Sequence, residues 1–173
     1  KRQIIDDLIH LTRAAIHSGD RGAWLAVLRA PWCGLTLADL TVLFGQDLQS
    51  TIPHLLEQAW SEELSSDGTQ RLQNFLKAWA PFAPQLQQSG LRVAIESLWL
   101  RLQGPKLLRA GSDLLDAERF FRLLGELDQK KWLLPDRFDE AMQGLYSQTQ
   151  NAEAQIEVMT MHKAKGLQFD TVI

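Results

Sequence analysis

The chain is short of cysteine and of long apolar runs, and both shortages limit what it can be. Cys33 is the only cysteine among the 173 residues, which excludes an internal disulfide and a cysteine-based zinc site. No apolar run approaches the roughly 20 residues that a membrane-spanning helix needs, and no signal peptide precedes the first expected helix. We therefore expect a protein of the reducing cytoplasm with no membrane partner.

An excess of positive charge is also missing. The chain has 18 lysines and arginines against 21 aspartates and glutamates, for a formal net charge of −3. This balance excludes a strong attraction of the whole chain to nucleic acid, but it leaves room for a local basic patch. The 45% of apolar residues is typical of a globular protein, and the length suffices for one well-cored domain with or without part of another.

The sequence motifs of several enzyme classes are absent as well. There is no G-x-x-x-x-G-K-[ST] phosphate loop, so we expect no nucleotide hydrolysis by this chain alone. Neither a G-x-S-x-G nucleophile elbow nor an H-E-x-x-H metal motif is present. The four histidines are scattered, and the acidic clusters lie at helix ends or on polar faces, several of them in first turns, where they offset the helix dipole. The sequence thus predicts no catalytic residue and no metal site.

Helical periodicity dominates the first 150 residues. Apolar residues recur at helical spacing over residues 3–17. Asp20 and Thr36 are placed to cap the next two helices, Pro31 to stop the first of these, and Gly45 to end the second. Further helices are expected from about Thr51, around 72–79, after Ser89-Gly90, from the cap Ser112, and from Pro135. A loop is expected at 65–68, and helix breaks are expected at Pro81, Pro84 and Gly104-Pro105. We therefore expect a mainly α fold, an irregular helical bundle, over residues 1–150.

The pattern changes after the polar stretch 147–151. Residues 156–161 alternate with period two, and 171–173 form an apolar β-branched triplet. Residues 151–173 are therefore predicted to form a short strand-loop-strand that belongs to a separate α/β domain. Since a natural chain rarely stops inside a buried strand, we expect the sequence to be an excerpt from a longer polypeptide.

The loop between these two strands concentrates polar chemistry. Thr160, His162, Lys163, Lys165 and Gly166 follow directly on the first strand. Loops at the carboxyl ends of strands bind ligands in α/β domains, and a glycine allows close approach of a phosphate. Taken alone, these residues fit a phosphate-binding loop and a solvated turn with a chance basic pair equally well.

Residues 159–169, Met-Thr-Met-His-Lys-Ala-Lys-Gly-Leu-Gln-Phe, resemble motif V of the UvrD-like superfamily 1 helicases, which reads T-x-H-x-x-K-G-L-E-[FWY]. The body of the chain is similar to the RecB and AddA branch of that family, on weaker matches at 28–31, 34–37 and 99–105. In that branch a helical 2B domain is inserted into the RecA-like domain 2A, just before motif V. The resemblance thus implies a 2B-like domain over 1–150 and, over 151–173, a fragment of domain 2A that carries motif V.

The resemblance implies that the parent is an ATP-dependent DNA helicase or helicase–nuclease, similar to exonuclease V, that acts in recombination and repair. ATP and Mg²⁺ would be cofactors of the parent, and none is expected in this chain alone. The implied partners are DNA, both single-stranded and at a duplex junction, and other subunits of a helicase–nuclease complex.

The resemblance also assigns residues. Motif V places Thr160, His162, Lys163 and Lys165 by the single-stranded DNA, and Gly166 and Gln168 by the nucleotide. Gln168 stands where the family has a glutamate, so it can still donate or accept a hydrogen bond but brings no charge.

A second DNA contact is implied near residue 35. A glycine-containing hairpin of UvrD-type 2B domains contacts duplex DNA through backbone amides, and Gly34, Leu35 and Thr36 occupy a similar place. Thr36 would lie at a helix N-terminus suited to an anion. A tight structural turn explains the same residues.

For the chain as a whole, the alternatives to a helicase fragment are a non-catalytic helical protein–protein docking module and a spacer that limits domain rotation.

Overall fold

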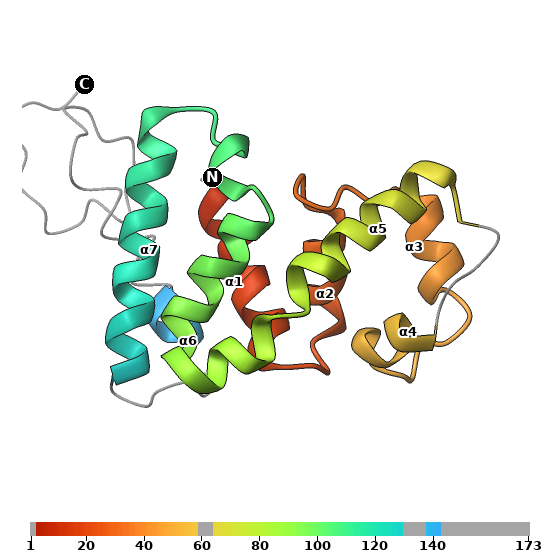
Figure 1. Ribbon diagram of the computed structural model, residues 1–173, viewed down its shortest axis with the longest axis horizontal. Coiled ribbons are helices and arrows are strands. Elements are labelled where there is room, and N and C mark those ends of the chain that lie inside the picture. The colour runs from red at the N-terminus through yellow and green to blue at the C-terminus, as the bar shows by residue number, and fades with distance from the viewer. Residues whose placement is uncertain (1–2, 59–63, 130–137, 143–173) are drawn as a thin grey trace, which may run out of the picture.

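The computed structural model describes residues 3–58, 64–129 and 138–142, and these form a mainly α, irregular helical bundle, as predicted (Figure 1). The elements are α1 (Gln3–Ile16), α2 (Arg21–Arg29), α3 (Leu37–Phe44), α4 (Ile52–Gln58), α5 (Ser66–Trp79), α6 (Phe82–Arg101), the 3₁₀ helix η1 (Gly104–Leu107) and α7 (Gly111–Gln129). Both predicted strands and the domain boundary at residue 150 lie outside the described residues. None of the helices in the described part is both long and apolar enough to cross a membrane.

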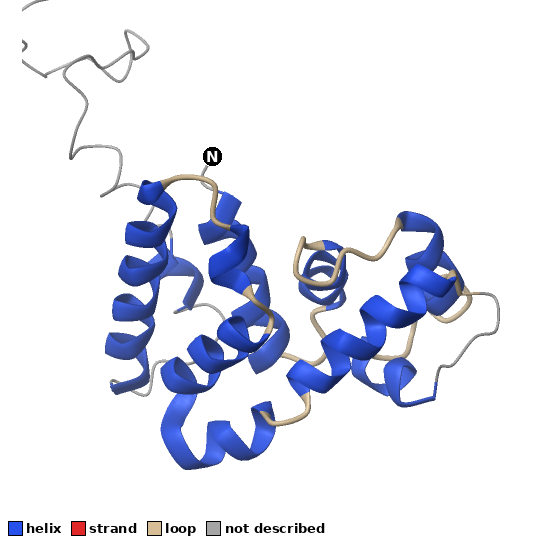
Figure 2. Ribbon diagram, turned by 45° about the horizontal axis from the view of Figure 1, so that its top comes forward, coloured by secondary structure: helices blue, strands red, loops and turns tan. Residues whose placement is uncertain are grey.

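The helices gather at two ends of the molecule, with α2 between them. α1, α6 and α7 pack together at one end, while α3, α4 and the start of α5 lie at the other (Figures 1 and 2). Trp79, at the end of α5, links α2 to α6, because its ring centroid lies 4.6 Å from that of Trp24 and 5.5 Å from that of Phe82. Aromatic rings at these separations stabilise the contact beyond the area that they bury. One apolar core therefore runs through both groups of helices.

Helix ends follow the local sequence at most of the predicted positions. The Asp20 carboxylate caps α2 by accepting a hydrogen bond from the Ala23 amide at 2.9 Å. α2 ends before Pro31, since a residue that precedes proline is disfavoured in the helical conformation. The short helix after Thr36 and its end at Gly45 are also confirmed.

Three predicted boundaries are wrong. Residues 66–68 are not a loop, because the hydroxyl of Ser65 accepts from the Gly68 amide at 2.9 Å and α5 begins at Ser66. Pro84 does not break α6, because it lies in the first turn, where the missing N–H costs nothing. Ser112 lies inside α7 rather than capping it, and the Asp113 carboxylate instead accepts from the Arg109 and Ala110 amides.

The break at Gly90 is confirmed as a kink within α6. Gly90 has φ +80°, a conformation that glycine adopts without steric cost. Asp128 of α7 accepts a hydrogen bond from the Leu91 amide at 2.9 Å, so it caps the second half of α6 from a neighbouring helix. A Cβ atom at Gly90 would lie 2.6 Å from that carboxylate.

This cap between two helices yields a stability prediction. We expect Asp128→Ala to lower the free energy of unfolding by about 1 kcal/mol, as loss of an N-cap usually does. Asp128→Asn keeps one acceptor oxygen and should cost roughly half as much. Urea unfolding of the two variants measures both values, and equal stability of Asp128→Ala and the wild type would contradict the cap.

Candidate functional site

The turn between α2 and α3 is the one predicted DNA contact that lies within the described residues. Gly34 has φ +72°, and a Cβ atom there would lie 2.6 Å from Nη1 of Arg71 on α5. Glycine is thus required twice at this position, by the backbone conformation and by the approach of the guanidinium. The turn is therefore shaped by a side chain 37 residues further along the chain.

The backbone amides of this turn are engaged within the chain. The Gly34 amide donates to the Ala30 carbonyl at 2.7 Å, and the Leu35 amide to the Leu28 carbonyl at 3.0 Å. The Thr36 amide donates to the Asp39 carboxylate at 3.1 Å. Because these three donors already have acceptors, a DNA phosphate at this turn would have to find another donor.

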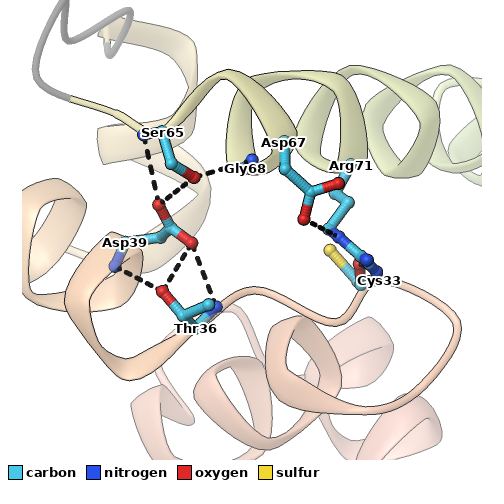
Figure 3. A network of polar contacts seen from close by, with 7 residues as sticks. All are labelled: Cys33, Thr36, Asp39, Ser65, Asp67, Gly68 and Arg71. Carbon is cyan, nitrogen blue, oxygen red and sulfur yellow. Dashed lines mark hydrogen bonds and ion pairs between the residues drawn. The ribbon is translucent and has the colours of Figure 1, made fainter.

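A buried carboxylate, Asp39, ties this turn to the start of α5 (Figure 3). Asp39 is only 4% exposed. Its carboxylate accepts hydrogen bonds from the Thr36 hydroxyl at 2.6 Å and from the Ser65 hydroxyl at 2.8 Å. Each hydroxyl is itself an N-cap: Thr36 accepts from the Asp39 amide, and Ser65 from the Gly68 amide. One carboxylate therefore holds the capping residues of two helices, α3 and α5.

The charge of Asp39 is stabilised in place. Burial by itself would raise the pKa of this carboxyl group, but the hydrogen bonds from Thr36 and Ser65 outweigh burial and leave the pKa below its ordinary value of 3.8. The N-termini of α3 and α5 both lie at the carboxylate. Because a helix N-terminus carries partial positive charge, both helix dipoles also stabilise the negative charge of Asp39. Asp39 thus fixes Thr36 in place and leaves its hydroxyl engaged as a cap.

The one cation that contacts the turn is Arg71, as far as the described residues extend (Figure 3). Its Nε donates to the Asp67 carboxylate at 2.5 Å and its Nη1 to the Cys33 carbonyl at 3.5 Å. The Arg71 side chain is 43% exposed and that of Asp67 71%. The guanidinium is therefore anchored on the turn and still reaches solvent, although Asp67 offsets part of its charge.

Sequence reasoning missed both Arg71 and Asp39. The spacing Thr36-x-x-Asp39 is a capping-box signal that predicts the contact between Asp39 and Thr36, but not the one between Asp39 and Ser65. No local pattern marks Arg71, because only the fold brings α5 beside the turn.

Cys33, which precedes the turn, is 2% exposed, and burial raises the pKa of its thiol to about 12, so it is a structural residue.

The motif V residues Thr160, His162, Lys163, Lys165, Gly166 and Gln168 lie outside the described residues. In the part of the chain that is described, no three histidine, cysteine, aspartate or glutamate side chains come together in a way that could hold a metal ion.

The sequence matches the family described as the UvrD-like helicase C-terminal domain, over residues 1–173. No curated protein and no solved structure matches the chain. The family match covers both the helical body and the segment that resembles motif V.

Proposed function

Because the chain belongs to the UvrD-like helicase C-terminal domain family, we propose that it works within an ATP-dependent DNA helicase or helicase–nuclease of the RecB/AddA type in recombination and repair. The single observation that supports this proposal is the family match over the full 173 residues, which includes both segments with implied DNA contacts. Membership of a helicase family implies nucleic-acid binding in general.

In this proposal residues 1–150 are a 2B-like domain that contacts duplex DNA beside the turn at Gly34. Arg71 would supply the phosphate contact, because the turn's amides are engaged and the guanidinium is the exposed donor there. Gly34 would admit the guanidinium, and Thr36 would hold the start of α3. The contact is thus made by a side chain on a rigid, capped scaffold.

Residues 151–173 would return the chain to a RecA-like domain 2A. Thr160, His162, Lys163 and Lys165 would contact the single strand, and Gly166 and Gln168 the nucleotide. ATP and Mg²⁺ would bind the parent, because this chain has no phosphate loop of its own. Motif V would then couple the state of the nucleotide to the grip on DNA.

The coupling role is tested in the full-length parent. We expect His162→Ala and Lys165→Ala each to reduce DNA-stimulated ATPase activity by about tenfold or more, because each removes a proposed contact to the single strand beside the nucleotide loop. The ATPase rate without DNA should change far less. A matched control is Lys106→Ala, which removes an exposed lysine from η1. Wild-type ATPase and unwinding in both motif V variants would refute the assignment.

A further inference from the structure

A groove of about 520 Å³ runs between α2 and α3, away from the Gly34 turn's contact with Arg71. Its lining includes Leu25 and Arg29 of α2, Leu37 and Phe44 of α3, and Leu48 beyond α3. The α3 residues that line it are spaced i, i+3, i+4 and i+7, and those of α2 include an i, i+4, i+8 row. Two such rows form a trough about two helical turns long, which is the shape that receives a third helix.

The floor of this groove is apolar, and large side chains stand open at its rim. Leu37 and Leu48 are each 68% exposed, more than any other large apolar side chain among the described residues. Leu25, which also lines the groove, is half-buried. Exposed leucines gathered around one groove mark an interaction surface more often than scattered ones do.

The rim is also held in a fixed shape. Arg21 donates hydrogen bonds to the carbonyls of Phe44, Asp47 and Ser50, at 2.6, 2.9 and 2.9 Å. The Asp47 carboxylate accepts from the amides of Gln49 and Ser50. These bonds fix the loop that carries Leu48, so a ligand would meet a preformed surface and lose little entropy in ordering it.

The charges in the groove have one sign. Among the described residues that line the groove, the charged ones are Arg21 and Arg29, although the whole chain is net negative. Arg21 is used by the loop carbonyls, whereas Arg29 is exposed and has no hydrogen-bond or ion-pair partner in the described part of the chain. A carboxylate is the group that complements Arg29, by a two-point hydrogen-bonded pair.

We propose that this groove is the docking site for a short, acidic amphipathic helix of a partner protein. Its apolar face would cover Leu37 and Leu48 in the manner of other helix-in-groove complexes, and a carboxylate beside that face would pair with Arg29. This docking is separate from the DNA contact, since it uses the α2–α3 groove rather than Arg71.

Three labelled synthetic peptides of about twelve residues test the proposal with the full chain, by fluorescence anisotropy. The first has leucines spaced i, i+3, i+4 and i+7 with glutamates on the flanks, the second replaces the glutamates with lysines, and the third scrambles the first. We expect the acidic amphipathic peptide to bind at least about tenfold more tightly than the other two. Equal binding of the acidic and the basic peptide would overturn the proposal.

Matched variants locate the site. Leu37→Glu and Arg29→Glu should each weaken binding of the acidic peptide by about tenfold, while Leu115→Glu and Arg122→Glu on α7 should leave it unchanged. Leu115 is 55% exposed and Arg122 is also exposed, and α7 lies at the opposite end of the molecule from α3 (Figure 1). Leu37 is the first residue of α3, where a glutamate is compatible with the helix dipole, so folding should be preserved.

The same variants distinguish a partner helix from two other possible ligands of the groove, a second copy of the chain and nucleic acid. If Leu37→Glu converts a dimer to a monomer in sedimentation experiments, the groove binds a second copy of the chain and the proposal is wrong. If Arg29→Glu weakens DNA binding but not peptide binding, the groove faces nucleic acid, which also overturns it.

Discussion

Replacing Asp39 with alanine should lower the free energy of unfolding by about 2 to 4 kcal/mol, the range for the loss of a buried hydrogen-bonded network. The carboxylate accepts hydrogen bonds from the hydroxyls and the amides of both Thr36 and Ser65. Alanine would remove all of these acceptors together and leave a small void between two helix N-termini. Urea unfolding followed by circular dichroism measures the change.

A smaller loss is expected from Asp39→Asn, about 1 to 2 kcal/mol, because the amide keeps the shape and one acceptor oxygen. Glu126→Ala on α7 is the control, since this side chain is exposed and its replacement should change stability by less than about 0.5 kcal/mol. If Asp39→Ala and Glu126→Ala unfold at the same urea concentration, the network does not stabilise the fold.

The stability difference between the wild type and Asp39→Asn should depend on pH. The pKa of Asp39 in the folded chain lies below its ordinary value of 3.8 because hydrogen bonds from Thr36 and Ser65 outweigh the effect of burial. The contribution of the charged carboxylate is therefore complete above the unfolded pKa and is lost as the pH falls through the lower, folded pKa. The difference should be constant near neutral pH and shrink below about pH 4. A difference that stays constant down to pH 3 would contradict this origin.

The same network shows why part of the site was predictable from sequence and part was not. The cap at Thr36 is a local feature, because Asp39, three positions further on, completes the capping box. The bond from Ser65 to Asp39 spans 26 residues, and Arg71 is 37 residues beyond Gly34. Local patterns carry no information on which helix packs beside which, so these contacts required the fold.

The misplaced boundary at 65–68 has the same origin. Ser-Ser-Asp-Gly is a typical loop composition, but serine and aspartate are also preferred at helix N-termini. Here Asp39 and Gly68 decide between the two: a Cβ atom on Gly68 would lie 2.6 Å from the Asp39 carboxylate, so only glycine fits in the first turn of α5. Asp39 therefore holds Ser65, the N-cap of a helix, where composition favoured a loop.

The proposed duplex contact yields a pair of opposite effects on DNA affinity. Arg71→Gln should weaken binding of a duplex with a single-stranded tail by about 3- to 10-fold, because it removes one phosphate contact. Asp67→Asn should strengthen the same binding by about 2- to 5-fold, because it removes the carboxylate that offsets the guanidinium. Asp67 also lies in the first turn of α5, so its replacement costs only a few tenths of a kcal/mol in stability.

The salt dependence of binding shows whether the lost contact is to phosphate. The slope of log K against log salt concentration should become shallower by about 1 in Arg71→Gln, as one fewer counterion is released. In Asp67→Asn the slope should be at least as steep as in the wild type, since the phosphate contact remains.

Two controls on α7 match these changes in charge. Arg122→Gln and Glu126→Gln alter the net charge by the same amounts, but both side chains are exposed on a helix at the other end of the molecule (Figure 1). Equal effects of Arg71→Gln and Arg122→Gln would mean that DNA responds to net charge alone, and the turn would have no special role. If the wild-type chain binds no DNA even at low salt, the helical body is better explained as a docking module, and the groove between α2 and α3 becomes its main functional surface.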